Sequence, residues 1–168
     1  MIPCCRGLVF LFLLLWPAVS FAQTSPTDAQ KIKSQADDIE DQAAQAIDDG
    51  DMSKGMDLMV HAVALDPTPI RRMNYGSMLF GNGVEIFKGS DQHLGQEVLR
   101  QAETQLLQAI QGFDPNKDQV YLSQCYYLLG EMYVNAFGDK VKAKAYYTKS
   151  AALSEFSGAK DALSKLSS

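Results

Sequence analysis

The sequence is poor in the residues from which most catalytic sites and metal centres are built. It holds only two histidines and three cysteines among 168 residues, and Cys4 and Cys5 lie at the extreme N-terminus. It also lacks a glycine-rich phosphate loop, because Gly81-Asn82-Gly83 is not followed by the lysine such a loop needs. These absences argue against an enzyme, and we expect no catalytic residue, no cofactor and no metal.

Clusters of basic side chains are lacking as well. The chain has 15 basic and 20 acidic side chains, and seven of the acids fall between Asp37 and Asp51. Nucleic acids and anionic membranes bind clustered lysine and arginine, so neither is an expected partner. A solvated helix face is the simplest explanation for the acids themselves.

The longest apolar run is too short to span a membrane. It covers residues 7–15 after the single basic residue Arg6, whereas a spanning helix needs about 20 apolar residues. Ala18 to Ala22 then supplies the small residues of a cleavage site. The pattern predicts a secretory signal peptide over residues 1–22, cleaved after Ala22, and hence a periplasmic or secreted protein. An uncleaved membrane anchor is the alternative.

Few residues of the mature chain suggest chemistry. Cleavage leaves Cys125 as the only cysteine, so no disulfide within the chain is expected, and an apolar helical context favours a buried thiol over a nucleophile. Asp57 and His61 are four residues apart on one predicted helix, but two ligands make a poor metal site and a solvated pair is favoured. His93 is expected to be exposed to solvent.

A helical motif in the C-terminal third is the most specific pattern in the chain. Tyr126-x-x-Leu129-Gly130-x-x-Tyr133, followed by Ala143-x-x-x-Tyr147-x-x-Ser150, resembles one tetratricopeptide repeat (TPR), a helix-turn-helix unit that stacks on copies of itself. Gly130 and Ala143 are small where two helices would cross, and Tyr147 would fill the space beside them. The pattern predicts a second helix packed closely on the first.

Looser copies of the motif precede it. Ala43 and Gly76 are 33 residues apart, close to the TPR period of about 34. We expect a lead into the first helix over 23–35, repeats over 36–68, 69–116 and 117–156, and a C-terminal capping helix over 157–168. The predicted fold is all-α, a TPR-like α-α superhelix of three helical hairpins plus the capping helix.

Several local signals predict where helices begin and end. Thr27 with Gln30 has capping-box spacing and predicts a first helix from Thr27 to about Asp49. Asp51 is expected to cap a second helix that Pro67 stops, and Ser90 or Asp91 to cap the second helix of the middle copy. Glu155 occupies the place of the proline that closes a repeat, so the third copy continues directly into the capping helix.

The middle copy is longer than the others. Gly76 and Ala102 are 26 positions apart, whereas Ala43 and Gly55 in the first copy are 12 apart. Phe80, Val84 and Phe87 continue the apolar face of its first helix. We expect two lengthened helices whose hairpin around Gly89 projects from the stack, with a kink or break at Gly81-Asn82-Gly83, since a glycine costs about 1 kcal/mol in a helix interior.

The resemblance implies a binding role. TPR domains bind extended peptides or helices of other proteins in a groove lined by their first helices. Asn74 matches the asparagine with which many repeats hold a ligand backbone, whereas Glu40 stands where cochaperones that grip carboxylate tails have lysine. Carried over by position, the groove would be lined by Glu40, Asp41, Met73, Asn74, Ser77, Tyr127 and Glu131.

The expected function is therefore that of an exported, non-enzymatic scaffold or adaptor of the cell envelope. Its partner would be another envelope protein or peptide, with a basic or apolar segment favoured by the acidic groove. The long middle hairpin leaves a dimer contact open. The alternative is a small-molecule carrier or transporter accessory protein; a closed apolar cavity between the first and second hairpins would favour the carrier, and an open groove the adaptor.

Overall fold

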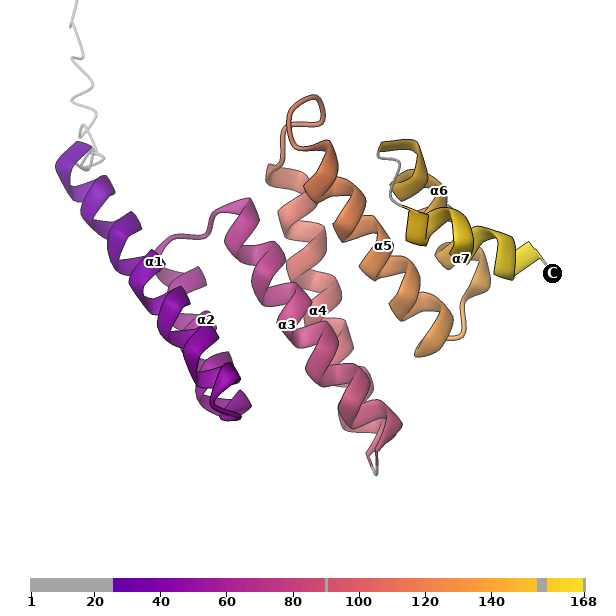
Figure 1. Cartoon of the computed structure of the whole chain (residues 1–168), viewed down its shortest axis with the longest axis horizontal. Coiled ribbons are helices and arrows are strands. Elements are labelled where there is room, and N and C mark those ends of the chain that lie inside the picture. The colour runs from indigo at the N-terminus through magenta and orange to yellow at the C-terminus, as the bar shows by residue number, and fades with distance from the viewer. Residues whose placement is uncertain (1–25, 90, 154–156, 168) are drawn as a thin grey trace, which may run out of the picture.

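The computed structural model describes residues 26–89, 91–153 and 157–167, which form seven α-helices and no strand (Figure 1). The all-α prediction is therefore confirmed for these residues. The predicted signal peptide over 1–22, Ser90 and Glu155 lie outside them. The helices are α1 (Pro26–Asp48), α2 (Met52–Leu65), α3 (Pro69–Lys88), α4 (Gln92–Gly112), α5 (Gln119–Asn135), α6 (Lys140–Leu153) and α7 (Ser157–Ser167).

Consecutive helices pair into hairpins that lie side by side along the long axis of the molecule (Figure 1). α1 packs on α2, α3 on α4 and α5 on α6, and neighbouring hairpins touch through α2 with α3, α4 with α5 and α3 with α5. α7 packs against α6 at the C-terminal end. None of the described helices is long and apolar enough to cross a membrane.

Short polar side chains begin most of the helices. The Asp51 carboxylate accepts a hydrogen bond from the Lys54 backbone N–H at 3.0 Å, and Asp91 and Asp139 begin α4 and α6 in the same way, as N-caps do. The first helix differs from the prediction, since α1 begins at Pro26 and places Thr27 inside its first turn. Proline is suited to that start because its fixed φ matches the helix.

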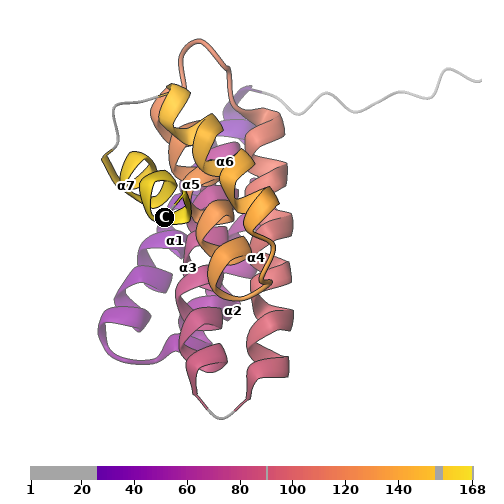
Figure 2. The same ribbon diagram turned by 90° about the vertical axis from the view of Figure 1, so that its right-hand side faces the viewer.

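The middle hairpin is built from two long helices, with 20 residues in α3 and 21 in α4 against 14 in α2 and α6. Its tip extends past the ends of the neighbouring hairpins in both views (Figures 1 and 2). Of the kink or break predicted at Gly81-Asn82-Gly83, the break is wrong, because α3 runs without interruption to Lys88. A Cβ at Gly83 would lie 2.8 Å from Cγ of Leu99, so this glycine lets α3 and α4 approach closely, and the packing gained offsets its low helix propensity.

Small side chains mark the lines along which helices meet. Ala43, Ala102, Ala109 and Ala143 are each 0% exposed. In the third hairpin Tyr147 packs beside Ala143, and the α7 residues Ala162, Leu163 and Leu166 cover both together with Tyr133. The apolar stripe of α7 therefore closes the C-terminal end of the core.

Candidate binding face

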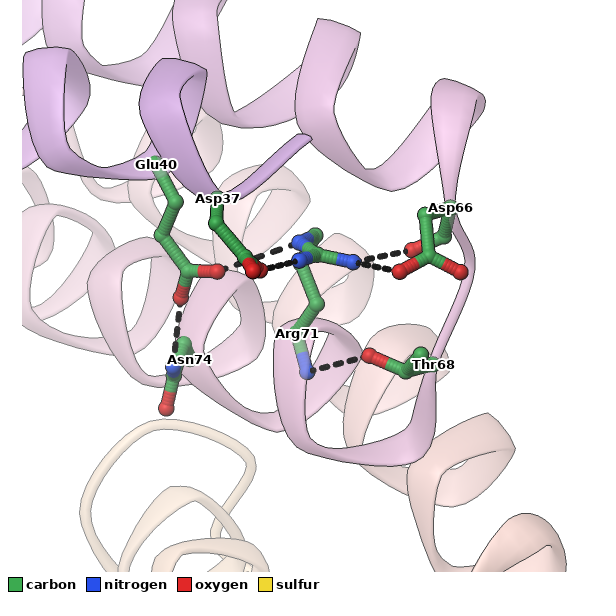
Figure 3. A network of polar contacts seen from close by, with 6 residues as sticks. All are labelled: Asp37, Glu40, Asp66, Thr68, Arg71 and Asn74. Carbon is green, nitrogen blue, oxygen red and sulfur yellow. Dashed lines mark hydrogen bonds and ion pairs between the residues drawn. The ribbon is translucent and has the colours of Figure 1, made fainter. Parts of the chain in front are cut away.

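A buried arginine joins the first two hairpins (Figure 3). Thr68 caps α3 and so fixes its first turn, in which Arg71 is only 3% exposed. Its Nη2 lies 2.6 Å from Oδ1 of Asp37, its Nε 3.1 Å from Oε2 of Glu40, and its Nη1 2.5 Å from Oδ2 of Asp66. One guanidinium thus binds α1, the α2–α3 turn and α3 to one another, because its five donors point in several directions.

The charge state of Arg71 follows from these contacts. Burial works to lower the pKa of the guanidinium, but hydrogen bonds and attraction from Asp66 and Glu40 raise it, and the resulting pKa lies above its ordinary value. Arg71 therefore remains charged in its buried position. The sequence patterns did not single out Arg71, which is separated from the acid-rich α1 by the whole of α2 and follows Asp66 by five residues.

The residues predicted to line the groove on α1 and α3 fall into different environments. Asn74 Nδ2 donates to Oε1 of Glu40 at 2.6 Å, so these two side chains meet (Figure 3). Asp41 is exposed and Met73 is buried in the core at 5% exposure. The Ser77 hydroxyl is buried, with no hydrogen-bond partner among the residues that the structure describes. The side-chain amide of Asn74, expected to hold the backbone of a ligand, thus donates to Glu40 of the same molecule.

The predicted groove residues of α5, Tyr127 and Glu131, lie in a hollow of about 530 Å³ that α5 shares with α6 and α7. Glu131 accepts from the Tyr147 hydroxyl at 2.7 Å and from Nδ2 of Asn135 at 3.1 Å. Burial, and then the neighbouring Glu131 charge, raises the pKa of Tyr127. Tyr127 and Glu131 therefore belong to one polar site at the C-terminal end, away from Glu40 and Asn74.

An apolar recess between α3 and α5 was not predicted as a site. It has a volume of about 510 Å³. Its apolar side chains recur on α3 at helical spacing, and a carboxylate stands at its edge. α3 continues beyond the end of α5 at this point (Figure 1), so part of its apolar face lacks a covering helix. The recess is lined by Phe80, Val84, Phe87 and Lys88 of α3, by Glu131, Met132 and Asn135 of α5, and by Ala136 directly after α5.

The side chains considered as a nucleophile or as metal ligands lie in positions unfavourable to those roles. Cys125 is 0% exposed, and burial raises its pKa to about 12, so the thiol stays protonated near neutral pH. Asp57 and His61 are exposed on α2. His93 is also exposed, with its Nδ1 3.6 Å from Glu97. No group of three or more His, Cys, Asp or Glu side chains with metal-binding geometry occurs among residues 26–89, 91–153 and 157–167.

Comparison with known proteins gives no relative: no family model matches the chain, and neither a curated protein nor a solved structure is similar to it. What the molecule can bind therefore follows from its own surfaces. The face formed by α1, α3 and α5, here called the first-helix face, lies toward the viewer in Figure 1. It offers the apolar recess, the Glu131 carboxylate at the edge of that recess, and the exposed Asp41 carboxylate on α1.

Proposed function

We propose that the protein is a non-enzymatic scaffold that binds a segment of another protein along the first-helix face, in the manner of the TPR proteins its third hairpin resembles. The pairing of successive helices supports a TPR-like stack. So does the close crossing of α5 and α6, where a Cβ at Gly130 would lie 2.5 Å from the Tyr147 ring. In such a stack each hairpin buries one face on its neighbour and leaves a continuous surface for a partner.

The observation that carries the proposal is the apolar recess between α3 and α5. Phe80, Val84 and Phe87 are only half-buried, so apolar surface remains in contact with water. Burying one Leu-sized side chain contributes about 1.5–3 kcal/mol. One such contact is too little for a specific complex, so the partner must also reach other parts of the face.

A partner with both apolar and basic side chains fits this face best. An apolar side chain would enter the recess and a lysine or arginine beside it would meet Glu131, while Lys88 lines the α3 side of the same recess. The exposed Asp41 on α1 would attract a second basic residue. Together with the signal peptide expected over residues 1–22, this describes an adaptor acting on another protein or peptide of the cell envelope.

The state of Cys125, the one cysteine outside the expected signal peptide, favours binding over catalysis. The Cys125 thiol is buried and protonated, whereas thiol nucleophiles act as thiolates. A small-molecule carrier remains the second candidate. Two recesses of about 420 and 380 Å³ lie between the first two hairpins, and both open to solvent, which favours an adaptor over a carrier with a closed cavity.

Photo-crosslinking in the native envelope tests the proposal. A photoreactive amino acid at position 84, in the recess, is compared with one at position 104, which is exposed on α4. We expect one predominant protein adduct from position 84 and none from position 104. The same adducts from both positions, or no adduct from position 84, would contradict the proposed binding face.

A further inference from the structure

Charge is unevenly distributed along the stack of hairpins. Residues 26–68 contain ten carboxylates and three lysines, residues 69–112 contain four groups of each sign, and residues 113–168 contain six carboxylates and seven lysines. The first hairpin and the α6–α7 end lie at opposite ends of the long axis (Figure 1). The molecule therefore has one strongly acidic end and one end that is neutral to basic.

The acidic end contains an ordered row of side chains. Asp38, Asp41, Gln45 and Asp48, here called the acidic stripe, are spaced three, four and three residues apart, so they share one face of α1. All four are exposed, whereas Ala43 on the opposite side is buried. No hydrogen bond or ion pair to Asp38 or Asp41 occurs within the described part of the chain, in contrast to Asp37 and Glu40.

The opposite end exposes a helix of unusual composition. α6 contains Lys140, Lys142, Lys144 and Lys149 and no acidic residue. Its outward face, here called the α6 ridge, consists of Val141, Ala145, Thr148 and Ala152, all exposed, with Val141 at 81%. The ridge is uncharged and built mainly of small side chains, and lysines border it on both sides.

We propose that the acidic stripe of α1 docks on the α6 ridge of a second copy of this chain, so that copies associate head to tail. Small side chains on the ridge allow a second helix to approach closely. Lys140 and Lys144 lie along one edge of the ridge, and Asp38 and Asp41 lie in one row of the stripe. Two lysine–aspartate ion pairs can therefore form at the same time. The two surfaces lie at opposite ends of one molecule (Figure 1), and so they can meet only between copies.

This contact would extend the stack from one molecule into the next. A head-to-tail contact that repeats gives an open chain, or a ring if the rotation closes. It does not require the apolar recess, which lies between α3 and α5, although Asp41 belongs to both proposed surfaces. An exposed ion pair contributes only about 0.2–1 kcal/mol, so the association is expected to be weak and sensitive to salt.

Charge reversal with cross-rescue tests the proposal. The mass of the purified protein is measured by analytical ultracentrifugation over a range of concentrations. Ionic strengths of about 0.01 M and about 1 M are compared, where the Debye length is about 30 Å and about 3 Å. At low salt we expect the average molar mass to rise at least about twofold with protein concentration. At high salt we expect it to remain that of the monomer.

Two double variants locate the contact. Asp38→Lys with Asp41→Lys should abolish the rise in mass, and so should Lys140→Glu with Lys144→Glu. An equimolar mixture of the two variants should restore it, because each then offers the charge that the other needs. Circular dichroism verifies that both variants are folded.

A matched control variant distinguishes the loss of the proposed contact from a general effect of net charge. Glu85→Lys with Glu97→Lys changes the net charge as much as the α1 variant, but on the exposed surface of the middle hairpin, and should leave the association intact. A protein that is monomeric under all conditions would overturn the proposal. So would a control that acts like the α1 variant, or a mixture of the two reversed proteins that stays monomeric.

Discussion

The ring of Tyr147 occupies the space that a side chain on residue 130 would need. A Cβ built on Gly130 would lie 2.5 Å from Cε1 and 2.6 Å from Cδ1 of Tyr147, while the tyrosine itself is 2% exposed. The hydroxyl of the same ring donates to Glu131, the next residue of α5. One tyrosine therefore fixes both the spacing of α5 and α6 and the position of a carboxylate on the candidate site.

Replacing Gly130 with alanine is expected to destabilise the protein. Overpacking a core typically costs about 1–3 kcal/mol, and the gain of about 1 kcal/mol from helix propensity offsets only part of that cost. Urea unfolding measures the change. Gly81→Ala is the matched control, since a Cβ at Gly81 would have nothing within 4 Å of it, and it should stabilise by about 0.5–1 kcal/mol. Equal effects of the two substitutions would contradict the close crossing.

Replacing Arg71 with alanine should cost about 3 kcal/mol of unfolding free energy. Removing one partner of a buried ion pair leaves uncompensated charge, and here Asp37, Glu40 and Asp66 would all lose their common cation. Arg72→Ala is the control, because Arg72 hydrogen-bonds neutral glutamines on α4 and its loss should cost about 1 kcal/mol. If both variants unfold at the same urea concentration, Arg71 does not hold the hairpins together.

Two tyrosines should make the fold sensitive to alkaline pH. Burial, and then the hydrogen bond and charge of Glu131, raise the pKa of Tyr147, and burial and Glu103 raise that of Tyr133. An unfolded tyrosine titrates near pH 10. The folded state thus holds these protons more tightly, so their contribution to stability is complete below about pH 10 and declines as pH rises toward the folded values.

Urea unfolding between about pH 8 and about pH 11 measures this decline. The double variant Tyr133→Phe, Tyr147→Phe should show a shallower loss of stability over that range than the unsubstituted protein. Tyr121→Phe, at a tyrosine that is 37% exposed, is the control and should follow the unsubstituted protein. Identical slopes in all three proteins would mean that the two buried hydroxyls do not titrate with folding.

A serine pair buried between α5 and α6 should respond differently to single and double substitution. The Ser123 hydroxyl donates to the Ser150 carbonyl oxygen at 3.0 Å, and that of Ser150 to the Ser123 carbonyl oxygen at 2.8 Å. Ser123→Ala or Ser150→Ala alone should cost about 1–2 kcal/mol, because the remaining hydroxyl loses its 3.0 Å contact with the removed hydroxyl and one buried carbonyl oxygen loses its side-chain donor. The double variant should cost less than the two single costs added together, and strict additivity in urea unfolding would contradict that coupling.

Helical periodicity and capping residues were sufficient to predict most of the helices. Asp51 and Asp91 begin helices as their side chains suggested. The break predicted at Gly81-Asn82-Gly83 is wrong because propensity describes an isolated helix, whereas Gly83 gains its contact with Leu99 only when α4 packs on it. Such a long-range contact leaves no local signal in the sequence.

The candidate site was predictable only in part, for a similar reason. Their positions in the repeat pattern identified Glu40 and Asn74 as candidate groove residues. The hydrogen bond between them and the ion pairs of Arg71 could not be predicted, because they depend on how α3 lies against α1. A lysine at position 40 would therefore disturb the fold as well as the surface charge. The apolar recess depends on where α5 ends relative to α3, which periodicity within a single helix cannot indicate.

If a protein partner binds at the recess between α3 and α5, substitutions in the recess should weaken its affinity. The partner identified by crosslinking is titrated against purified Val84→Asp and Thr104→Asp proteins, both first shown to be folded by circular dichroism. A carboxylate in the recess should raise the dissociation constant at least about tenfold, equivalent to about 1.4 kcal/mol, while the substitution on α4 should leave it unchanged. Equal affinities of the two variants would contradict binding at the recess.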